Sequence, residues 1–294
     1  MAKRSTPARR LEFALWALIG ILWASASLAE TDAGKPERIV SLNLCTDQFV
    51  MMLTPPERIA AISYHAVNPD TSNLAEQAKE LPITSTLAEE VLTLKPDLVI
   101  AGTLTTRPTI NLLRRLGYPV LEVPPANSIE EIRRNVLMIA DAIGEPSKGE
   151  ALIEAMDARL AAAAVDPGDA RPIAAPYYGG NNTSGRGTLI DESLRRAGFR
   201  NLAAKKGMRG PSRLPLEQLV LDEPDLILLG LSSVRRRSLT IGNLGHPAML
   251  NLLERVPNIT IPDRMWICGT PMIADVVARL AAKREEIVAG RESP

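Results

Sequence analysis

The chain has few side chains that bind metal ions directly. It contains two histidines, His65 and His246, and no histidine-rich loop. Protein sites for bare zinc or manganese are usually built from several histidines and carboxylates. His246 precedes Pro247 and is interpreted as a turn residue at the start of a helix. We therefore expect no metal site and no cofactor, and any metal should reach the protein inside a chelator.

An excess of charge of one sign is also missing. The 34 basic and 34 acidic residues cancel at pH 7. Such a chain offers no broad electrostatic attraction to nucleic acid or to an anionic membrane. The hydrophobic content of 46% is ordinary for a globular protein that buries a sizeable core. We therefore expect a globular protein without a nucleic-acid partner.

Recognisable catalytic motifs are absent. Residues 182–185 depart from the G-x-S-x-G pattern that exposes a catalytic serine, and the glycine-rich segment 179–187 is not a Walker loop. His65 could act as a base with Ser41 or Asp47, but no sequence spacing supports such a pair. We therefore expect no catalytic residues and no enzyme, and we keep an exported hydrolase as the weaker alternative.

Long apolar runs are confined to the N-terminus. Basic residues within 3–10 precede an apolar run at 13–23, and small residues follow at 24–29. This layout is typical of a secretory signal peptide that is cut after Ala26 or Ala29. The apolar run is shorter than the ~20 residues that a membrane-spanning helix needs. We expect residues 1–29 to be a signal peptide that directs the protein to the periplasm.

The chain contains an internal repeat. Residues 89–107 and 217–235 share Glu, Pro, Asp, Gly and Arg at one spacing, and each matched pair is 128 residues apart, as in Glu89 and Glu217. Each copy predicts a short helix, a turn at Pro-Asp and an apolar strand that ends in glycine. Strands without polar alternation are typical of parallel sheets covered on both faces. The repeat predicts two lobes, with a single doubly wound domain as the alternative.

A rhythm of strands and helices continues around both copies of the repeat. Alternation of this kind predicts parallel sheets in both halves. In the first half we expect strands at 38–42, 58–63, 98–101 and 120–123, and helices at 88–94, 109–116 and 128–143. In the second half we expect strands at 173–177, 226–229 and 265–268, and helices at 189–197, 249–255 and 273–287.

A single long helix is predicted between the two halves. Residues 145–164 begin with Pro146 near the first turn, are rich in strong helix formers, and are followed by Asp-Pro-Gly at 166–168. We expect this helix to join the lobes as a stiff strut, with an ordinary crossover helix inside one lobe as the alternative. The predicted fold is α/β, with two parallel-sheet lobes at 30–144 and 167–294, a connecting helix at 145–166 and a ligand cleft between the lobes.

These features resemble the helical-backbone group of periplasmic substrate-binding proteins, which serve importers of ferric siderophores, haem and cobalamin. The resemblance covers essentially the whole chain after the signal peptide. It implies a monomer that captures a small-molecule metal chelate and delivers it to an ABC permease dimer in the inner membrane. A chelate sensor that docks to a receptor is the alternative. The resemblance rests on RIVSLNLCTDQ at 38–48, the block at 89–100, the connecting helix, LPLEQLV at 214–220 and MWICGTP at 265–271.

The resemblance also implies one glutamate on each lobe that docks onto basic residues of the permease. The residues of this chain that match are Glu89 and Glu217. Two carboxylates on equivalent helices could straddle a partner with two-fold symmetry, and charge pairs of this kind mainly set orientation and association rate. The alternative is that both are ordinary solvated glutamates.

Aromatic residues make up 3% of the chain, so the position of each one is informative. In open parallel sheets, ligands bind beyond the carboxyl ends of the strands. Flat side chains with a polar tip at those ends suit a large, partly hydrophobic chelate. For Tyr177 and Trp266, core packing is the alternative. The expected ligand-binding residues are Asn43, Tyr64, Arg107, Tyr177, Tyr178, Arg235 and Trp266.

Two arginines occupy equivalent positions in the repeat. Arg107 and Arg235, if they face one cleft, would favour an anionic ligand such as an iron chelate. A solvated run at 235–237 is the alternative. The sequence leaves the ligand open among catecholate, hydroxamate and carboxylate siderophores, haem and cobalamin.

The state of the two cysteines is also open. Cys45 and Cys268 both flank the predicted cleft. An even number of cysteines in an oxidising compartment favours a disulfide. However, a bond at this place would tie the lobes together and restrict ligand entry. A disulfide and two buried free thiols therefore both remain possible.

Overall fold

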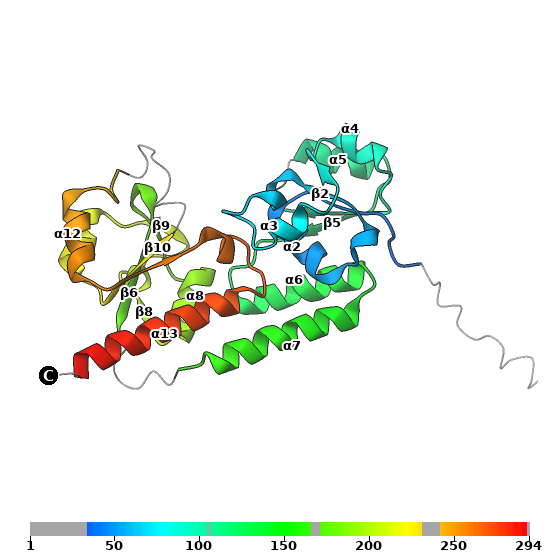
Figure 1. Cartoon of the computed structure of the whole chain (residues 1–294). Helices are drawn as coiled ribbons and strands as arrows, with labels where there is room; N and C mark the ends of the chain where they lie inside the picture. Colours follow the sequence, from blue (N-terminus) through cyan, green and yellow to red (C-terminus); the bar gives the residue numbers. More distant parts are fainter. Residues whose placement is uncertain (1–33, 104, 106, 166–170, 231–241, 293–294) are drawn as a thin grey trace, which may run out of the picture. The chain divides into compact units, whose positions relative to one another are not determined.

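The computed structural model describes residues 34–103, 105, 107–165, 171–230 and 242–292 (Figure 1). The chain divides into residues 1–35 and a compact unit that begins at Pro36, and only the second is considered below. The predicted signal peptide lies outside the described residues, as does Arg235. Within the described ranges, no helix is long and apolar enough to cross a membrane.

The first half of this unit contains a five-stranded parallel sheet with the order β3-β2-β1-β4-β5. Its strands are β1 (Ile39–Ser41), β2 (Ile59–Ser63), β3 (Ile83–Thr84), β4 (Leu98–Gly102) and β5 (Val120–Val123). Four of the five were expected, and β3 was not. The helices are α2 (Leu44–Leu53), α3 (Ala75–Ala78), α4 (Ala88–Thr93), α5 (Arg107–Arg115) and α6 (Ile129–Ala142).

Helices cover both faces of this sheet because successive strand residues point to opposite sides. Ile39 and Ile100 pack with residues of α2 and α6, whereas Val40 and Val99 pack with residues of α4 and α5. This arrangement explains why the central strands carry no polar alternation.

The second half contains a four-stranded parallel sheet with the order β11-β10-β6-β8. Its strands are β6 (Ile173–Tyr177), β8 (Arg200–Asn201), β10 (Leu226–Gly230) and β11 (Asn258–Ile261). A separate, small antiparallel sheet is formed by β7 (Asn182–Ser184) and β9 (Pro211–Arg213). The helices are α8 (Leu189–Arg196), α9 (Leu202–Lys205), α10 (Leu216–Asp222), α12 (Pro247–Arg255) and α13 (Ile273–Glu292). Together the two sheets confirm the predicted α/β class.

The strand predicted at 265–268 is wrong. The strand is β11, at Asn258–Ile261, and it is followed by a 3₁₀ turn at Asp263–Met265. The apolar run Met265–Cys268 has the composition of a buried strand, but its Ile267 side chain is exposed. Pro262 lies between β11 and the turn, and the residues after the turn line the cleft described below.

Residues 43–47, which follow β1, form the N-cap and the first turn of α2. The polar start of this segment is a helix cap, because the Asn43 side chain accepts a hydrogen bond from the backbone N–H of Cys45 at 2.9 Å. Asparagine at the N-cap satisfies a backbone donor that the helix itself leaves unpaired. Asn43 therefore begins α2 directly after the first strand.

The internal repeat has a common structural basis at the amino ends of the central strands. Asp97 accepts hydrogen bonds from the backbone N–H groups of Glu37 at 2.6 Å and Arg38 at 3.0 Å. Asp225 accepts one from the N–H of Ile173 at 2.6 Å. In each half, the aspartate of the Pro-Asp turn thus links the strand of the repeat to the first strand of the same sheet, β4 to β1 and β10 to β6. The repeated sequence encodes the same joint twice.

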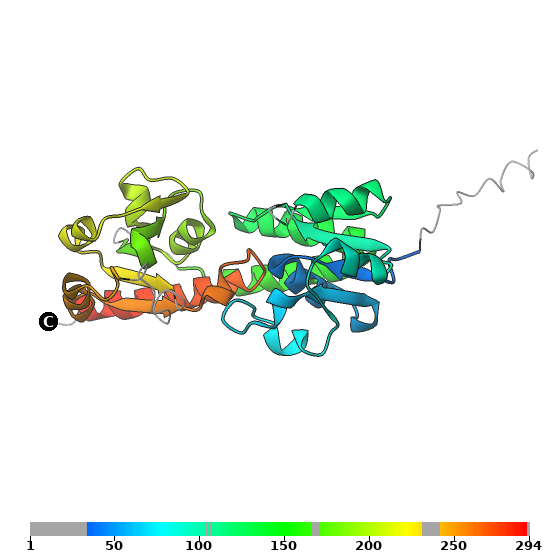
Figure 2. The same cartoon turned by 90° about the horizontal axis from the view of Figure 1, so that it is seen from above.

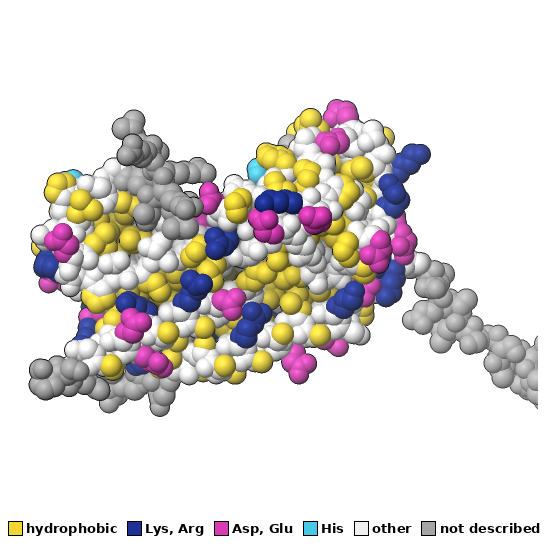
Figure 3. All heavy atoms as spheres, in the orientation of Figure 1, with side chains coloured by type: hydrophobic (Ala, Val, Ile, Leu, Met, Phe, Trp, Pro, Cys, Tyr) yellow, Lys and Arg dark blue, Asp and Glu magenta, His cyan; other side chains and the backbone are white. Residues whose placement is uncertain are grey.

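The long helix predicted between the halves is confirmed as α7 (Pro146–Ala162). It packs against α6 and α13, where a Cβ at Gly149 would lie 2.6 Å from the Cβ of Ala140. Arg133 on α6 pairs with Asp157 at 2.7 Å, and Figure 3 shows basic and acidic side chains intermixed on this face of the molecule. The largest apolar cluster runs through α2, α6, α7, α8 and α13. That α7 marks a boundary between two domains remains a proposal.

Candidate functional site

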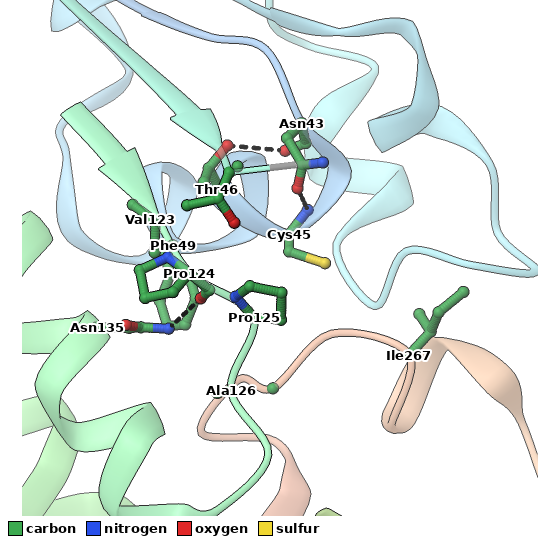
Figure 4. A pocket seen from close by; sticks show the side chains of 13 residues that line it. Asn43, Cys45, Thr46, Phe49, Val123, Pro124, Pro125, Ala126, Asn135 and Ile267 are labelled. Atoms are coloured by element: carbon green, nitrogen blue, oxygen red, sulfur yellow. Dashed lines mark hydrogen bonds between the residues drawn. The ribbon is translucent and has the colours of Figure 1, made fainter. Parts of the chain in front are cut away.

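A cavity of about 180 Å³ lies beyond the carboxyl ends of the first sheet's strands. Figure 4 shows the start of α2, the residues after β5 and a segment of the second half around it. Its walls are mainly apolar, with hydroxyl and amide groups between them. The lining residues are Asn43, Cys45, Thr46, Phe49, Gly102, Thr103, Val123, Pro124, Pro125, Ala126, Asn135, Ile267 and Gly269.

A larger cavity of about 620 Å³ adjoins the first. The two share Pro125, Ala126 and Ile267, and we refer to them together as the cleft. The second cavity collects residues from the carboxyl end of β6, from β7 and from the start of α8. Its lining residues are Pro125, Ala126, Asn127, Tyr178, Gly179, Asn182, Ser184, Thr188, Leu189, Ile190, Pro211, Asp263, Trp266 and Ile267.

The structure brings together two of the predicted ligand residues. The rings of Tyr178 and Trp266 meet edge to face, with centroids 5.0 Å apart and an interplanar angle of 70°. The indole N–H of Trp266 donates to Asp263 at 3.4 Å, and the Tyr178 hydroxyl lies 3.4 Å from that of Ser184. Burial raises the pKa of Tyr178 far above its usual value, so the phenol stays neutral. Together they form a rigid aromatic surface.

Asn43 lines the smaller cavity, as expected. Its Oδ1 atom is held by the N–H of Cys45, and its side chain lies so close to Gly102 that a Cβ there would be 3.1 Å away. Within the described ranges, the Asn43 amide NH₂ has no hydrogen-bond acceptor, so it can donate to a ligand.

A disulfide between Cys45 and Cys268 joins segments that are 223 residues apart, which decides the question that the sequence left open. We call residues 263–269 the strap; Figure 2 shows it in orange beside the blue start of α2. The Asn73 side chain donates to the carbonyl of Arg264 at 2.5 Å. A Cβ at Gly269 would lie 2.6 Å from the Cβ of Ala126. The strap is therefore fixed to the first half of the chain.

A buried carboxyl group lies directly behind the cleft. Asp47 on α2 is fully buried and accepts hydrogen bonds from the Ser63 hydroxyl at 2.5 Å and the Ser63 N–H at 3.2 Å. Ser41 hydrogen-bonds to Thr46, which lines the cleft, at 2.8 Å. Burial raises the pKa of Asp47 to about 7, although the serine hydrogen bonds partly oppose the rise.

Other predicted ligand residues lie elsewhere. Tyr177 does not line the described cavities: its side chain is 0% exposed and packs in the core, because neighbouring strand residues point to opposite faces. Tyr64 is 51% exposed and stacks beside His65, with ring centroids 3.9 Å apart. Arg107 begins α5 and pairs with Glu122 at 2.7 Å. Neither Tyr64 nor Arg107 lines the described cavities.

Two parts of the cleft were missed. One is the loop after β5, at 124–127, which follows from the same strand-end rule as the other loops but was not considered. The other consists of Ser184 in β7 and Thr188, the N-cap of α8, which carry no sequence signal of their own. Asp263 is the one charged side chain among the described lining residues. No described group of three or more His, Cys, Asp or Glu residues could hold a metal ion.

Glu89 and Glu217 occupy equivalent positions, as the repeat predicts. Each lies exposed in the first turn of its helix, α4 or α10, and neither lines the cleft. No ion pair is formed by either glutamate with another described residue. Both carboxylates are therefore accessible from solvent.

Parallel sheets whose strand ends meet an aromatic-lined cleft define a protein that binds a small ligand. The family model described as periplasmic binding protein matches residues 39–239. The chain therefore belongs to the periplasmic binding protein family, which binds substrates and is not catalytic.

Individual proteins of similar sequence or structure support this assignment. A cobalamin-binding protein of Halobacterium salinarum is 27% identical over 215 residues, which cover 72% of this chain and 58% of the relative's length. The heme-binding protein RhuT of Roseiflexus sp. RS-1, in apo form, has a TM-score of 0.67 at 23% identity, with 86% and 99% of the two chains covered. The vitamin B12 binding protein BtuF of Vibrio cholerae has a TM-score of 0.64 at 19% identity, with 86% and 98% covered. The two structures share the two-lobed α/β fold.

Proposed function

We propose that this chain is the substrate-binding protein of an ABC importer. It captures a metal chelate in the periplasm and delivers it to a permease dimer in the inner membrane. The observation that carries this proposal is the cleft, in which Tyr178 and Trp266 form an aromatic wall beside uncharged amide and hydroxyl groups. A wall of this kind suits a large, partly apolar ligand. The predicted N-terminal signal peptide supports export, and the family supports a binding role.

Within the chelates, the described lining favours a corrinoid over an anionic iron chelate. Arg107 was one of two arginines that suggested an anionic ligand, but it pairs with Glu122 and does not line the cleft. The described lining offers neutral donors and acceptors together with one carboxylate, Asp263. The relative named as a cobalamin-binding protein supports the same ligand class.

A ligand panel tests this proposal. In a chain that begins at residue 30, Trp266 is the only tryptophan, so its fluorescence reports on the cleft. We expect saturable quenching by cyanocobalamin, with stoichiometric binding in calorimetry as an independent readout that inner-filter absorption does not affect. Ferric catecholate, hydroxamate and carboxylate siderophores and hemin complete the panel. Binding of an iron chelate alone would replace the corrinoid, and no binding by any member would reject the chelate proposal.

The alternative partner is a receptor instead of a permease. A chelate sensor would use the same cleft, and only its docking partner would differ. Reconstitution with the cognate permease in proteoliposomes separates the two. Ligand uptake that depends on the binding protein supports the importer, and ligand binding without any stimulation of uptake supports the sensor.

A further inference from the structure

A groove of about 660 Å³ lies along β8, the edge strand of the second sheet. It is separate from the cleft, with which it shares no lining residue. One acidic residue, Asp191, lines it. The cationic lining residues, all of them exposed, are Arg171, Arg186, Arg195, Arg200 and Lys205.

The one carboxylate of the groove is already engaged. Asp191 is buried and accepts hydrogen bonds from Asn201 at 3.1 Å, from the N–H of Gly187 at 3.4 Å and from Arg195 at 3.4 Å. It can therefore neutralise little beyond Arg195. The other four cationic side chains of the groove form no hydrogen bond or ion pair with any described residue. These are Arg171, Arg186, Arg200 and Lys205.

Neighbouring cations outside the groove are neutralised. Arg196, next to Arg195, pairs with Glu192 at 2.9 Å. Lys206, next to Lys205, pairs with Asp222 at 2.7 Å. The chain as a whole has equal numbers of basic and acidic residues. The excess of positive charge is thus local to the groove, and like charges held close together favour a bound anion.

Backbone hydrogen bonds hold the segments of the groove in place. The N–H of Arg200 donates to the carbonyl of Pro172 at 2.8 Å, which brings Arg200 beside Arg171. The N–H of Arg186 donates to the carbonyl of Met208 at 2.9 Å. Lys205 ends α9, which begins directly after β8. The cations therefore project from a fixed frame, which lowers the entropy that a ligand must remove on binding.

We propose that this groove is a second binding site, which takes a ligand that carries phosphate groups. The planar fork of arginine matches phosphate oxygens in bidentate fashion, and three unpaired arginines suit more than one phosphate or a phosphate with a second anionic group. The volume lies within the ~300–1,000 Å³ typical of small-molecule sites. The phosphates can belong to a soluble polyphosphate or to an anionic lipid headgroup.

Two probes and one pair of matched variants test the site. Calorimetry with tripolyphosphate and co-sedimentation with vesicles of phosphatidylglycerol, against vesicles of phosphatidylcholine, distinguish the two sources of phosphate. We expect saturable binding of at least one probe. Arg200→Gln combined with Lys205→Gln should weaken it at least tenfold, because two unpaired cations leave the groove.

The control variant removes the same charge from the adjacent residues. Arg196→Gln combined with Lys206→Gln should change the affinity by less than about twofold, because both side chains are ion-paired outside the groove. Equal losses in the two double variants would show a diffuse field and overturn the site. Absence of saturable binding by both probes at about 0.1 M salt would overturn it as well. Neither result bears on the chelate cleft.

Discussion

The aromatic surface of the cleft depends on Tyr178 and Trp266. Their edge-to-face contact fixes both rings, and burial keeps the phenol of Tyr178 neutral. The hydroxyl lies 3.4 Å from Ser184, which is long for a hydrogen bond between hydroxyls. The apolar ring, more than the hydroxyl, should therefore contribute to ligand affinity.

We expect Tyr178→Ala to weaken chelate binding by about ten- to a hundredfold, or ~1.4–2.7 kcal/mol, because it removes buried aromatic area and the support of Trp266. Tyr178→Phe should cost less than about threefold. Calorimetry with the best ligand of the panel measures both. A loss in Tyr178→Phe as large as that in Tyr178→Ala would show that the hydroxyl dominates. Tyr64→Ala, at an exposed ring outside the described cleft lining, should cost less than about twofold.

Asp47 makes the stability of the fold depend on pH. Its pKa rises from 3.8 to about 7 on folding, mainly because of burial. Between these values the folded chain binds more protons than the unfolded chain, so this group makes stability fall as pH rises from about 4 to about 7. The total change is of the order of 4 kcal/mol, since each pKa unit corresponds to ~1.4 kcal/mol.

Asp47→Asn should remove this dependence, because an amide keeps hydrogen-bond capacity toward Ser63 but does not ionise over this range. Urea unfolding at several values between pH 5 and pH 8 measures the effect. We expect the stability of the wild type relative to the variant to decline across that range. A constant difference would mean that Asp47 does not titrate there.

At the scale of elements, the strap determines the shape of the cleft. It carries Trp266 and Ile267, and it is held to the first half by Cys45, Asn73 and Ala126. Cys45→Ser combined with Cys268→Ser should lower the free energy of unfolding by about 2–4 kcal/mol. Ligand affinity should fall roughly tenfold, because Trp266 is less firmly placed.

Denaturant unfolding and calorimetry on the double variant check both effects. The oxidised wild type treated with a thiol reductant serves as the chemical counterpart and should reproduce the variant. If the variant retained wild-type affinity, the remaining contacts of the strap would be sufficient to hold Trp266.

The close approach of α6 and α7 gives a second test at this scale. A Cβ at Gly149 would meet Ala140 at 2.6 Å, whereas a Cβ at Gly290 in α13 would meet nothing within 4 Å. Alanine is better than glycine in a helix by about 1 kcal/mol, and overpacking costs about 1–3 kcal/mol. We expect Gly149→Ala to destabilise the protein by ~1 kcal/mol and Gly290→Ala to leave it equal or more stable. The midpoint of thermal unfolding compares the two variants. Equal shifts of the midpoint would mean that α6 and α7 move apart to accommodate the added methyl group at no cost.

At the scale of the whole molecule, the two halves present equivalent carboxylates. Reversal of Glu89 and Glu217 to Arg should abolish uptake in a reconstituted importer and leave ligand affinity within about threefold, because neither residue lines the cleft. Loss of ligand binding would assign the carboxylates to the ligand site, and normal uptake would leave them as plain surface residues.

A matched reversal controls for net charge. Glu150 and Glu254 are exposed residues on α7 and α12. Their joint reversal to Arg changes the charge of the protein by the same amount, so uptake should be retained. A comparable loss in this control would indicate a general effect of charge on the association with the permease.

Most of the α/β pattern could be predicted because apolar strands, Pro-Asp turns and helix caps are local signals. The cleft was harder to predict for two physical reasons. Tyr177 packs in the core whereas the adjacent Tyr178 lines the cleft, and the sequence does not indicate which of the two faces the core. Met265–Cys268 has the composition of a buried strand, but a disulfide and tertiary contacts place it as the strap. Whether Arg107 meets a ligand or Glu122 likewise depends on contacts that are distant in sequence.

The disulfide also sets an order of events in biosynthesis. Cys268 follows Cys45 by 223 residues, so the bond cannot close until nearly all of the chain has been synthesised and delivered. The first sheet can form earlier, since its strands end at Val123. Trp266, which completes the aromatic wall, arrives only with the strap. A nascent or truncated chain therefore lacks this wall of the cleft, and the protein acquires its complete ligand site as one of the last steps of its own assembly.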